Sequence, residues 1–127
     1  NPDNDRDAEA QSIAIQMEHL HSRRPLTHDL MKSLADNLGV VLEEVYIYHW
    51  ESGIFYSELR FRNGEKFLKI DSRTSDAVAL ALRYNCPIYI AASVVTKTAI
   101  PIWLRESLAG KSLLKQRNPR QPNIISR

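Results

Sequence analysis

The sequence predicts an α+β fold, in which an antiparallel β-meander packs with helices in a single domain and forms part of a mixed sheet. Residues 40–70 hold three stretches of alternating apolar and polar residues, separated by turn-forming residues at 51–53 and 63–64. Apolar residues recur at helical spacing on either side of this region. The 127 residues, of which 43% are hydrophobic and 25% charged, are enough for one domain with its own core.

Composition excludes several classes of protein. No apolar run approaches the roughly 20 residues that cross a bilayer, so we expect no membrane partner. The single cysteine, Cys86, excludes an internal disulfide and fits a reducing compartment, so we predict a cytoplasmic protein. The net charge of +2 is too small to indicate nucleic-acid binding by itself.

The first part of the chain is predicted to be helical. Residues 1–7 are polar and acidic and are expected to form a flexible lead-in. Apolar periodicity then predicts a helix over Ala8–Arg23. A second helix is predicted over His28–Leu38, with Thr27 as its cap and Gly39 ending it. We expect its buried stripe to consist of Leu30, Met31, Leu34 and Leu38.

Three strands follow, over Val40–Trp50, Ile54–Arg62 and Glu65–Ile70, and the Asn63-Gly64 pair favours a two-residue hairpin turn. Alternation in the first strand predicts one face with Val41, Val45, Ile47 and His49, and another with Leu42, Glu44, Tyr46 and Tyr48. The aromatic residues of the meander fit two roles, a platform that stacks nucleobases or cross-strand packing, and packing is the commoner of the two. They are Tyr46, Tyr48, Trp50, Phe55, Tyr56 and Phe61.

The last third of the chain is predicted to be irregular. A short buried strand is expected over Ile88–Ala91, a helical turn over Ser93–Ala99 and a last helix beginning at Pro101. Residues 105–127 contain six basic residues and one acidic residue, with prolines and asparagines. We expect this segment to be a basic, partly disordered tail.

The junction between the third strand and the next helix, residues 71–83, concentrates polar side chains. Thr74 or Ser75 is a candidate cap, and Asp76 suits the positive end of a helix that runs to Tyr84. Asp76 and Arg83 then lie along one stripe of that helix. The spacing is compatible with a structural cap and ion pair, or with a site.

A second polar motif lies in the first exposed turn of the second helix. His28 and Asp29 are residue types that ligate metals or move protons. Neighbours in sequence do not share a helix face, so the two need not act together. A surface histidine without a ligand is the alternative.

Two ordered motifs carry a resemblance. Asp71–Tyr89 reads D-S-R-T-S-D-A-V-A-L-A-L-R-Y-N-C-P-I-Y, and Arg24–Leu30 reads R-P-L-T-H-D-L. Both are similar to motifs of the bifunctional nuclease domain family, and Glu9-Ala10 and residues 53–57 occur in the matching order. The resemblance covers roughly residues 9 to 100, and two ordered motifs are more specific than one.

The resemblance implies a metal-dependent nuclease that acts on phosphodiester bonds of RNA and DNA, uses Mg²⁺ or Mn²⁺, and forms a homodimer or higher homo-oligomer. It implies catalytic roles for His28, Asp71 and Asp76, with His28 as general acid or base. The implied metal ligands are Asp71, Asp76, Asp29 and Glu9. The implied substrate-binding residues are Arg24, Arg73, Ser75 and Arg83.

The chain also departs from the family pattern. The family's motif usually has proline where Thr74 stands, and family members normally have several strands before the helix that bears Glu9. We therefore expect a family domain over residues 8–104 that lacks those first strands. Two other functions remain open, a non-catalytic nucleic-acid-binding module and a structural oligomerisation domain.

Overall fold

The computed structural model describes residues 23–97, 100–108 and 112–117. The predicted helix over residues 8–23 therefore lies outside the described residues, apart from Arg23. The elements are α2 (Thr27–Asn37), β1 (Val41–Glu51), β2 (Ile54–Asn63), β3 (Lys66–Arg73), α3 (Thr74–Tyr84), β4 (Ile88–Ala91), α4 (Ala92–Lys97), α5 (Ile102–Ser107) and β5 (Leu114–Arg117). None of the helices in the described part of the chain is long and apolar enough to span a membrane.

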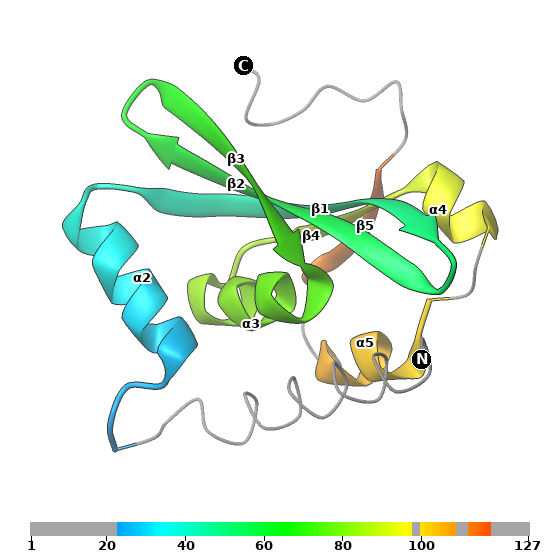
Figure 1. The fold of residues 1–127 in the computed structure, drawn as a ribbon, viewed down its shortest axis with the longest axis horizontal. Helices are drawn as coiled ribbons and strands as arrows, with labels where there is room; N and C mark the ends of the chain where they lie inside the picture. Colours follow the sequence, from blue (N-terminus) through cyan, green and yellow to red (C-terminus); the bar gives the residue numbers. More distant parts are fainter. Residues whose placement is uncertain (1–22, 98–99, 109–111, 118–127) are drawn as a thin grey trace.

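The predicted α+β fold with a mixed sheet is confirmed. The strands lie in the order β3-β2-β1-β4-β5, with β1, β2 and β3 antiparallel and β4 and β5 parallel to their neighbours (Figure 1). Ser52 and Gly53 both have positive φ, 52° and 83°, as the two-residue turn between β1 and β2 requires. The second turn is displaced by one residue from the prediction, because Asn63 still pairs with Lys66 and the turn consists of residues 64–65.

Helix α3 is the centre of the core. Its residues Ala77 to Leu82 are buried without interruption, since their small and branched side chains let the helix pack closely against β1 and β2. Val45, Ile47, Leu59 and Phe61 of the sheet belong to the same buried cluster. Asn85, in the left-handed conformation with φ 54°, ends the helix.

The predicted faces of β1 are wrong in part. Leu42 and Val45 were expected on opposite faces, yet both lie in the core, and Val41 is half exposed. The register with β2 shifts between Leu42 and Glu44 and again between Ile47 and His49. An extra residue at a bulge reverses the alternation beyond it, so a strict period of two assigns the wrong faces.

The predicted buried stripe of α2 is also wrong. Leu30, Leu34 and Leu38 are 63%, 61% and 65% exposed, and Met31 is 42% exposed. The helix turns its other side to α3, where His28 is buried and Ala35 packs against the core. Hydrogen bonds of His28 and Asp29 with α3 determine this orientation, and the apolar stripe faces outward.

Strand β5 was not predicted, and it lies within the segment expected to be a basic, partly disordered tail. Arg117 in β5 places its guanidinium 2.9 Å from the Glu44 carboxylate, which Arg60 approaches to 3.6 Å from β2. All three side chains are buried, and burial raises the pKa of Glu44 although both guanidiniums oppose the shift. A buried ion cluster thus joins the edge strand β5 to β1 and β2.

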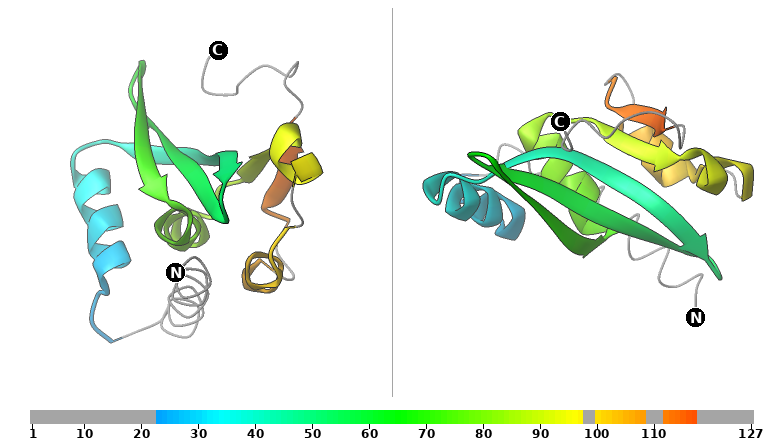
Figure 2. Two further views of the ribbon diagram at one scale, coloured as in Figure 1. Left: turned by 45° about the vertical axis from the view of Figure 1, so that its right-hand side comes forward. Right: turned by 90° about the horizontal axis from the view of Figure 1, so that it is seen from above.

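The two faces of the meander differ. Helices α2 and α3 lie on one face, and the view from above shows β1, β2 and β3 with no described helix over the other (Figure 2). In the register, one cross-strand row consists of Tyr46, Glu58 and Asp71. Because the neighbouring row with Val45 and Leu59 faces the core, this row projects from the other face. We call it the open face below.

A buried hydrogen-bond chain attaches the start of α3 to β2. The Thr74 hydroxyl lies 2.5 Å from that of Ser57 and donates to the Phe55 carbonyl at 3.3 Å. Because that carbonyl only accepts, the Ser57 hydroxyl is left to donate to Thr74. The predicted side-chain cap of α3 is therefore wrong: Arg73 is the N-cap residue, without a side-chain cap bond, and Thr74 turns inward.

Thr74→Val is expected to lower the free energy of unfolding by about 1–3 kcal/mol, because the buried Ser57 hydroxyl and Phe55 carbonyl lose their partner. Urea unfolding measures the change. Thr74→Ser, which keeps the hydroxyl, should recover much of it. Thr96→Val, at an exposed threonine, is the matched control and should change stability by about 0.5 kcal/mol or less. Equal effects of the two valine substitutions would contradict the prediction.

Candidate functional site

Three predicted site residues meet at the start of α3. His28 Nε2 lies 3.0 Å from Asp76 Oδ1, and Arg73 Nε donates to Asp76 Oδ2 at 3.1 Å. The Arg73 side chain is 74% exposed and that of Asp76 31%, whereas that of His28 is only 9% exposed. Asp76 and Arg73 therefore face solvent, and the buried His28 ring holds the Asp76 carboxylate by a hydrogen bond from the protein interior.

A second pair joins the same two helices. Arg83 Nε donates to Asp29 Oδ1 at 2.6 Å, and Arg83 also donates to the Ala79 carbonyl. Asp29 Oδ2 accepts from the amide of Leu26, the N-cap residue of α2. The sequence placed Asp76 and Arg83 on one stripe of α3, but each pairs with α2 rather than with the other. The Arg83 side chain is 4% exposed, so in this arrangement it holds the helices together.

The charged states of both aspartates follow from these partners. Burial raises the pKa of Asp76, but the hydrogen bonds from Arg73 and His28 outweigh it and leave the pKa below its usual value. The pKa of Asp29 is also below its usual value: burial raises it, but the hydrogen bonds from the Leu26 amide and Arg83 lower it by more. Both carboxylates are therefore ionised at neutral pH.

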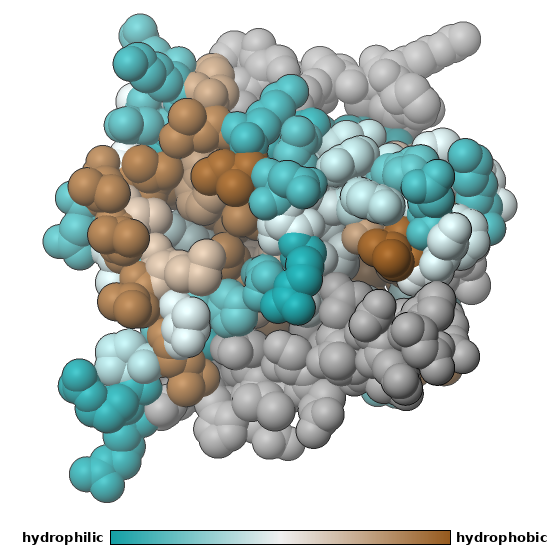
Figure 3. All heavy atoms as spheres, viewed as in Figure 1, coloured by the Kyte–Doolittle hydropathy of each residue, from teal (hydrophilic) through white to brown (hydrophobic). Residues whose placement is uncertain are grey.

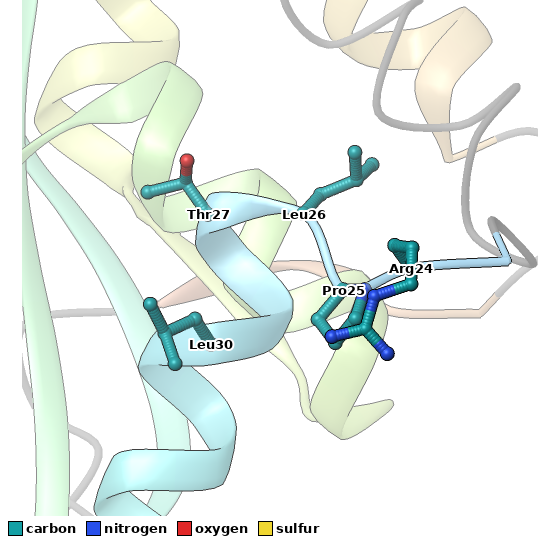
Figure 4. A pocket seen from close by; sticks show the side chains of 5 residues that line it. All are labelled: Arg24, Pro25, Leu26, Thr27 and Leu30. Atoms are coloured by element: carbon teal, nitrogen blue, oxygen red, sulfur yellow. The ribbon is translucent and has the colours of Figure 1, made fainter.

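Of the remaining predicted residues, the structure describes Asp71, Ser75 and Arg24. Asp71 projects from the open face and accepts a long hydrogen bond, 3.4 Å, from the Tyr48 hydroxyl. Ser75 is buried in the first turn of α3. Arg24 lines a cavity of about 290 Å³ at the entrance to α2, together with Pro25, Leu26, Thr27 and Leu30 (Figure 4). Glu9 lies outside the described residues.

The described side chains do not by themselves fit a divalent ion. Within the described ranges no three His, Cys, Asp or Glu residues cluster closely enough to hold one metal. Both Asp76 oxygens already accept hydrogen bonds from His28 or Arg73, and both Asp29 oxygens from Leu26 or Arg83. A hard cation prefers several oxygen ligands, and guanidinium groups compete for these.

Sequence reasoning missed the residues that position the site. The Ser57–Thr74 bond joins residues 17 apart in the chain, and Tyr48 approaches Asp71 from another strand. Thr74 gave one signal, since it departs from the family's proline. Ser57 lies in the segment 53–57 that the resemblance covers, but the sequence does not show its partner, because the fold brings Thr74 to β2.

Asp76 and Asp29 should make stability depend on pH in acid. Because their pKa values are lowered on folding, their contribution is present above the unfolded pKa, about 3.9, and is lost as pH falls through the folded values. In urea unfolding between pH 6 and pH 2.5, Asp76→Asn should therefore destabilise most at pH 6 and least at pH 2.5. Asp36→Asn controls for the loss of one carboxylate. A difference between wild type and Asp76→Asn that stays constant across this range would contradict the assignment.

Comparison with known proteins agrees with this arrangement of motifs. The model of the bifunctional nuclease domain matches residues 6–105. Two proteins of Mycobacterium tuberculosis, "Uncharacterized protein MT1877" of strain CDC 1551 / Oshkosh and "Uncharacterized protein Rv1829" of strain ATCC 25618 / H37Rv, are each 39% identical over 95 residues. The matched segment is 75% of this chain and 56% of each relative, so the chain spans about half the length of these relatives. The chain belongs to the bifunctional nuclease domain family.

Proposed function

We propose that the protein is a nuclease that hydrolyses phosphodiester bonds of RNA or DNA at the Asp76–Arg73 site, in the cytoplasm. The observation that carries the proposal is the group formed by His28, Asp76 and Arg73, in which an ionised carboxylate and an exposed guanidinium are held side by side at a helix start. Family membership supports a nucleic-acid-related activity.

Arg73 is suited to binding the substrate phosphate. Its guanidinium presents several N–H donors in a fork that matches phosphate oxygens, and most of the side chain is in solvent. It also lies at the N-terminal end of α3, where the partial positive charge of the helix attracts anions. Arg24, exposed beside the cavity at α2, is a second candidate for a phosphate.

Asp76 is suited to orienting the attacking water. An ionised carboxylate accepts a hydrogen bond from water, and the His28 Nε2–H fixes one oxygen so that the other faces Arg73. His28 acts here as a positioning residue, because its ring is buried and it touches Asp76 rather than solvent. Asp71 and Arg73 are two residues apart on β3, so both project from the same side of the strand. Asp71 is therefore part of the proposed site.

A divalent ion, Mg²⁺ or Mn²⁺, remains part of the proposal as a cofactor. Mg²⁺ is often held by one or two carboxylates together with substrate phosphates, so the ligand set need not be complete before substrate binds. Glu9 is the remaining predicted ligand. If bound, such an ion would stabilise the charge that develops on the phosphoryl oxygens.

The outward stripe of α2 favours an additional proposal, a symmetric homodimer. Apolar side chains gather over α2 and the β3 edge of the sheet (Figure 3). On β3, Leu68 and Ile70 project to the α3 side, because they are opposite Phe61 and Leu59. Together with the α2 stripe they form an exposed apolar surface of the kind that pairs with a second copy.

Asp76→Asn is expected to reduce cleavage of single-stranded RNA or DNA by about 10²-fold, or roughly 2.7 kcal/mol of lost transition-state stabilisation. His28→Gln should lower kcat because the carboxylate loses its support, and Arg73→Gln should chiefly raise KM. Cleavage is followed with labelled oligonucleotides in Mg²⁺, Mn²⁺ or a chelator.

Asp36→Asn is the matched control, since Asp36 is an exposed aspartate of α2 paired with Lys32, and it should cleave as wild type does. If Asp76→Asn and Asp71→Asn fold normally and also cleave normally, the carboxylates are structural. Wild-type protein that binds oligonucleotides without cleaving them under any metal condition would instead indicate a non-catalytic binding module.

Leu34→Glu is expected to convert the dimer into a 14.6 kDa monomer, because it places a charge in the middle of the apolar stripe. Sedimentation at micromolar concentration measures the mass. Ile102→Glu, at a 71% exposed residue of α5, is the matched control and should leave the dimer intact. A wild-type protein that sediments only as monomer would rule out the dimer.

A further inference from the structure

We propose that the open face carries a base-stacking strip for single-stranded nucleic acid, formed by Tyr48, Tyr56 and His49 next to the packed ring of Tyr46. The inference rests on the proposed nuclease site and names the form of substrate which that site would receive. The strip lies on β1 and β2, outside the group formed by His28, Asp76 and Arg73.

The four rings form a continuous series. The Tyr48 ring lies 6.4 Å from the rings of both Tyr46 and Tyr56, and His49 lies 5.2 Å from Tyr56. Tyr48 is 38% exposed, His49 is exposed, and Tyr46 and Tyr56 are half-buried. The guanidiniums of Arg60 and Arg117 lie over the Tyr46 ring, so the ring faces available to other flat groups are those of Tyr48, His49 and Tyr56.

A bulge in β1 produces this exposure. The register shifts between Ile47 and His49, so that Ser57 is opposite Ile47, Tyr56 is opposite His49, and Tyr48 is the extra residue. Regular alternation would bury one of two successive residues, whereas here both Tyr48 and His49 are exposed. Bulges that direct side chains outward are common beside functional sites.

The register links the strip to the proposed site. Tyr56 is directly opposite His49 on one side and Arg73 on the other, so one cross-strand row runs His49–Tyr56–Arg73. Arg73 also donates to Asp76. A phosphate held by Arg73 would therefore have its neighbouring bases at Tyr56 and then Tyr48.

The chemistry around the strip favours an unpaired strand. Bases of a duplex stack on each other and cannot reach aromatic side chains, whereas single strands stack on them with little sequence preference. Glu58 is paired with Arg60, but the Asp71 carboxylate contacts the Tyr48 hydroxyl. The negative charge of Asp71 repels phosphates from the rings, so the phosphates of a bound strand would lie on the side of Arg73.

The test is binding of a labelled 12-nucleotide single strand, RNA or DNA, and of the matching duplex, measured by fluorescence anisotropy in a chelator. Tyr48→Ala and Tyr56→Ala should each weaken single-strand binding by about 5- to 100-fold, the range for loss of one stacked base. Tyr48→Phe keeps the ring and should bind within about 3-fold of wild type. Duplex binding should be weaker and insensitive to these changes.

Phe67→Ala is the matched control, because Phe67 is 40% exposed on β3 but lies opposite Arg62, away from Arg73. It should bind as wild type does. Unchanged single-strand binding by Tyr48→Ala, or an equal loss in Phe67→Ala, overturns the strip. Weakened binding in Tyr48→Ala without cleavage in any metal supports the strip and overturns the nuclease, whereas cleavage with unchanged binding does the reverse. A wild-type protein that binds no oligonucleotide overturns both.

Discussion

The arrangement of this domain depends on the two polar pairs between α2 and α3, His28–Asp76 and Asp29–Arg83. Two successive residues, His28 and Asp29, hold α3 at Asp76 and Arg83, two turns apart. Buried charged pairs contribute little net stability, but removing one partner leaves the other unpaired, so they select one orientation over others. That orientation turns the apolar stripe of α2 outward and brings His28 behind the Asp76 carboxylate. The shape of the surface and the candidate site thus have one physical cause.

Charged groups serve a similar purpose on the other side of the sheet. Glu44 is enclosed by Arg60 and Arg117, whose guanidiniums lie over the rings of Tyr46 and Tyr89. This cluster attaches β5 to the sheet through side chains as well as through backbone pairing. The apolar core around α3 supplies the hydrophobic stabilisation, and the ion pairs on each side of it determine which peripheral elements dock and how.

Arg73 is the point where the proposed site and the proposed stacking strip meet. It is the last residue of β3, the N-cap of α3, the partner of Asp76 and the neighbour of Tyr56 in the sheet. Its guanidinium pairs with the ionised Asp76 carboxylate, and the proposed strip adjoins it through Tyr56. A strand-to-helix junction gives such a residue access to both the helix side and the open face of the sheet, which a residue within either element lacks.

The sequence by itself determined the local structure: the meander, helices α2 and α3, strand β4 and the family followed from alternation, helical spacing and two motifs. Each of these signals depends on residues close in the chain. The tertiary structure alone decided which face of α2 is buried, where β1 bulges, and that His28 meets Asp76 across 48 residues. It also decided that β5 forms. The local sequence of the basic tail does not predict this strand, because Arg117 and its partner Glu44 come together only in the folded sheet. Apolar periodicity reports that a helix has two faces, but the pairing of polar groups from distant segments selects the one that packs.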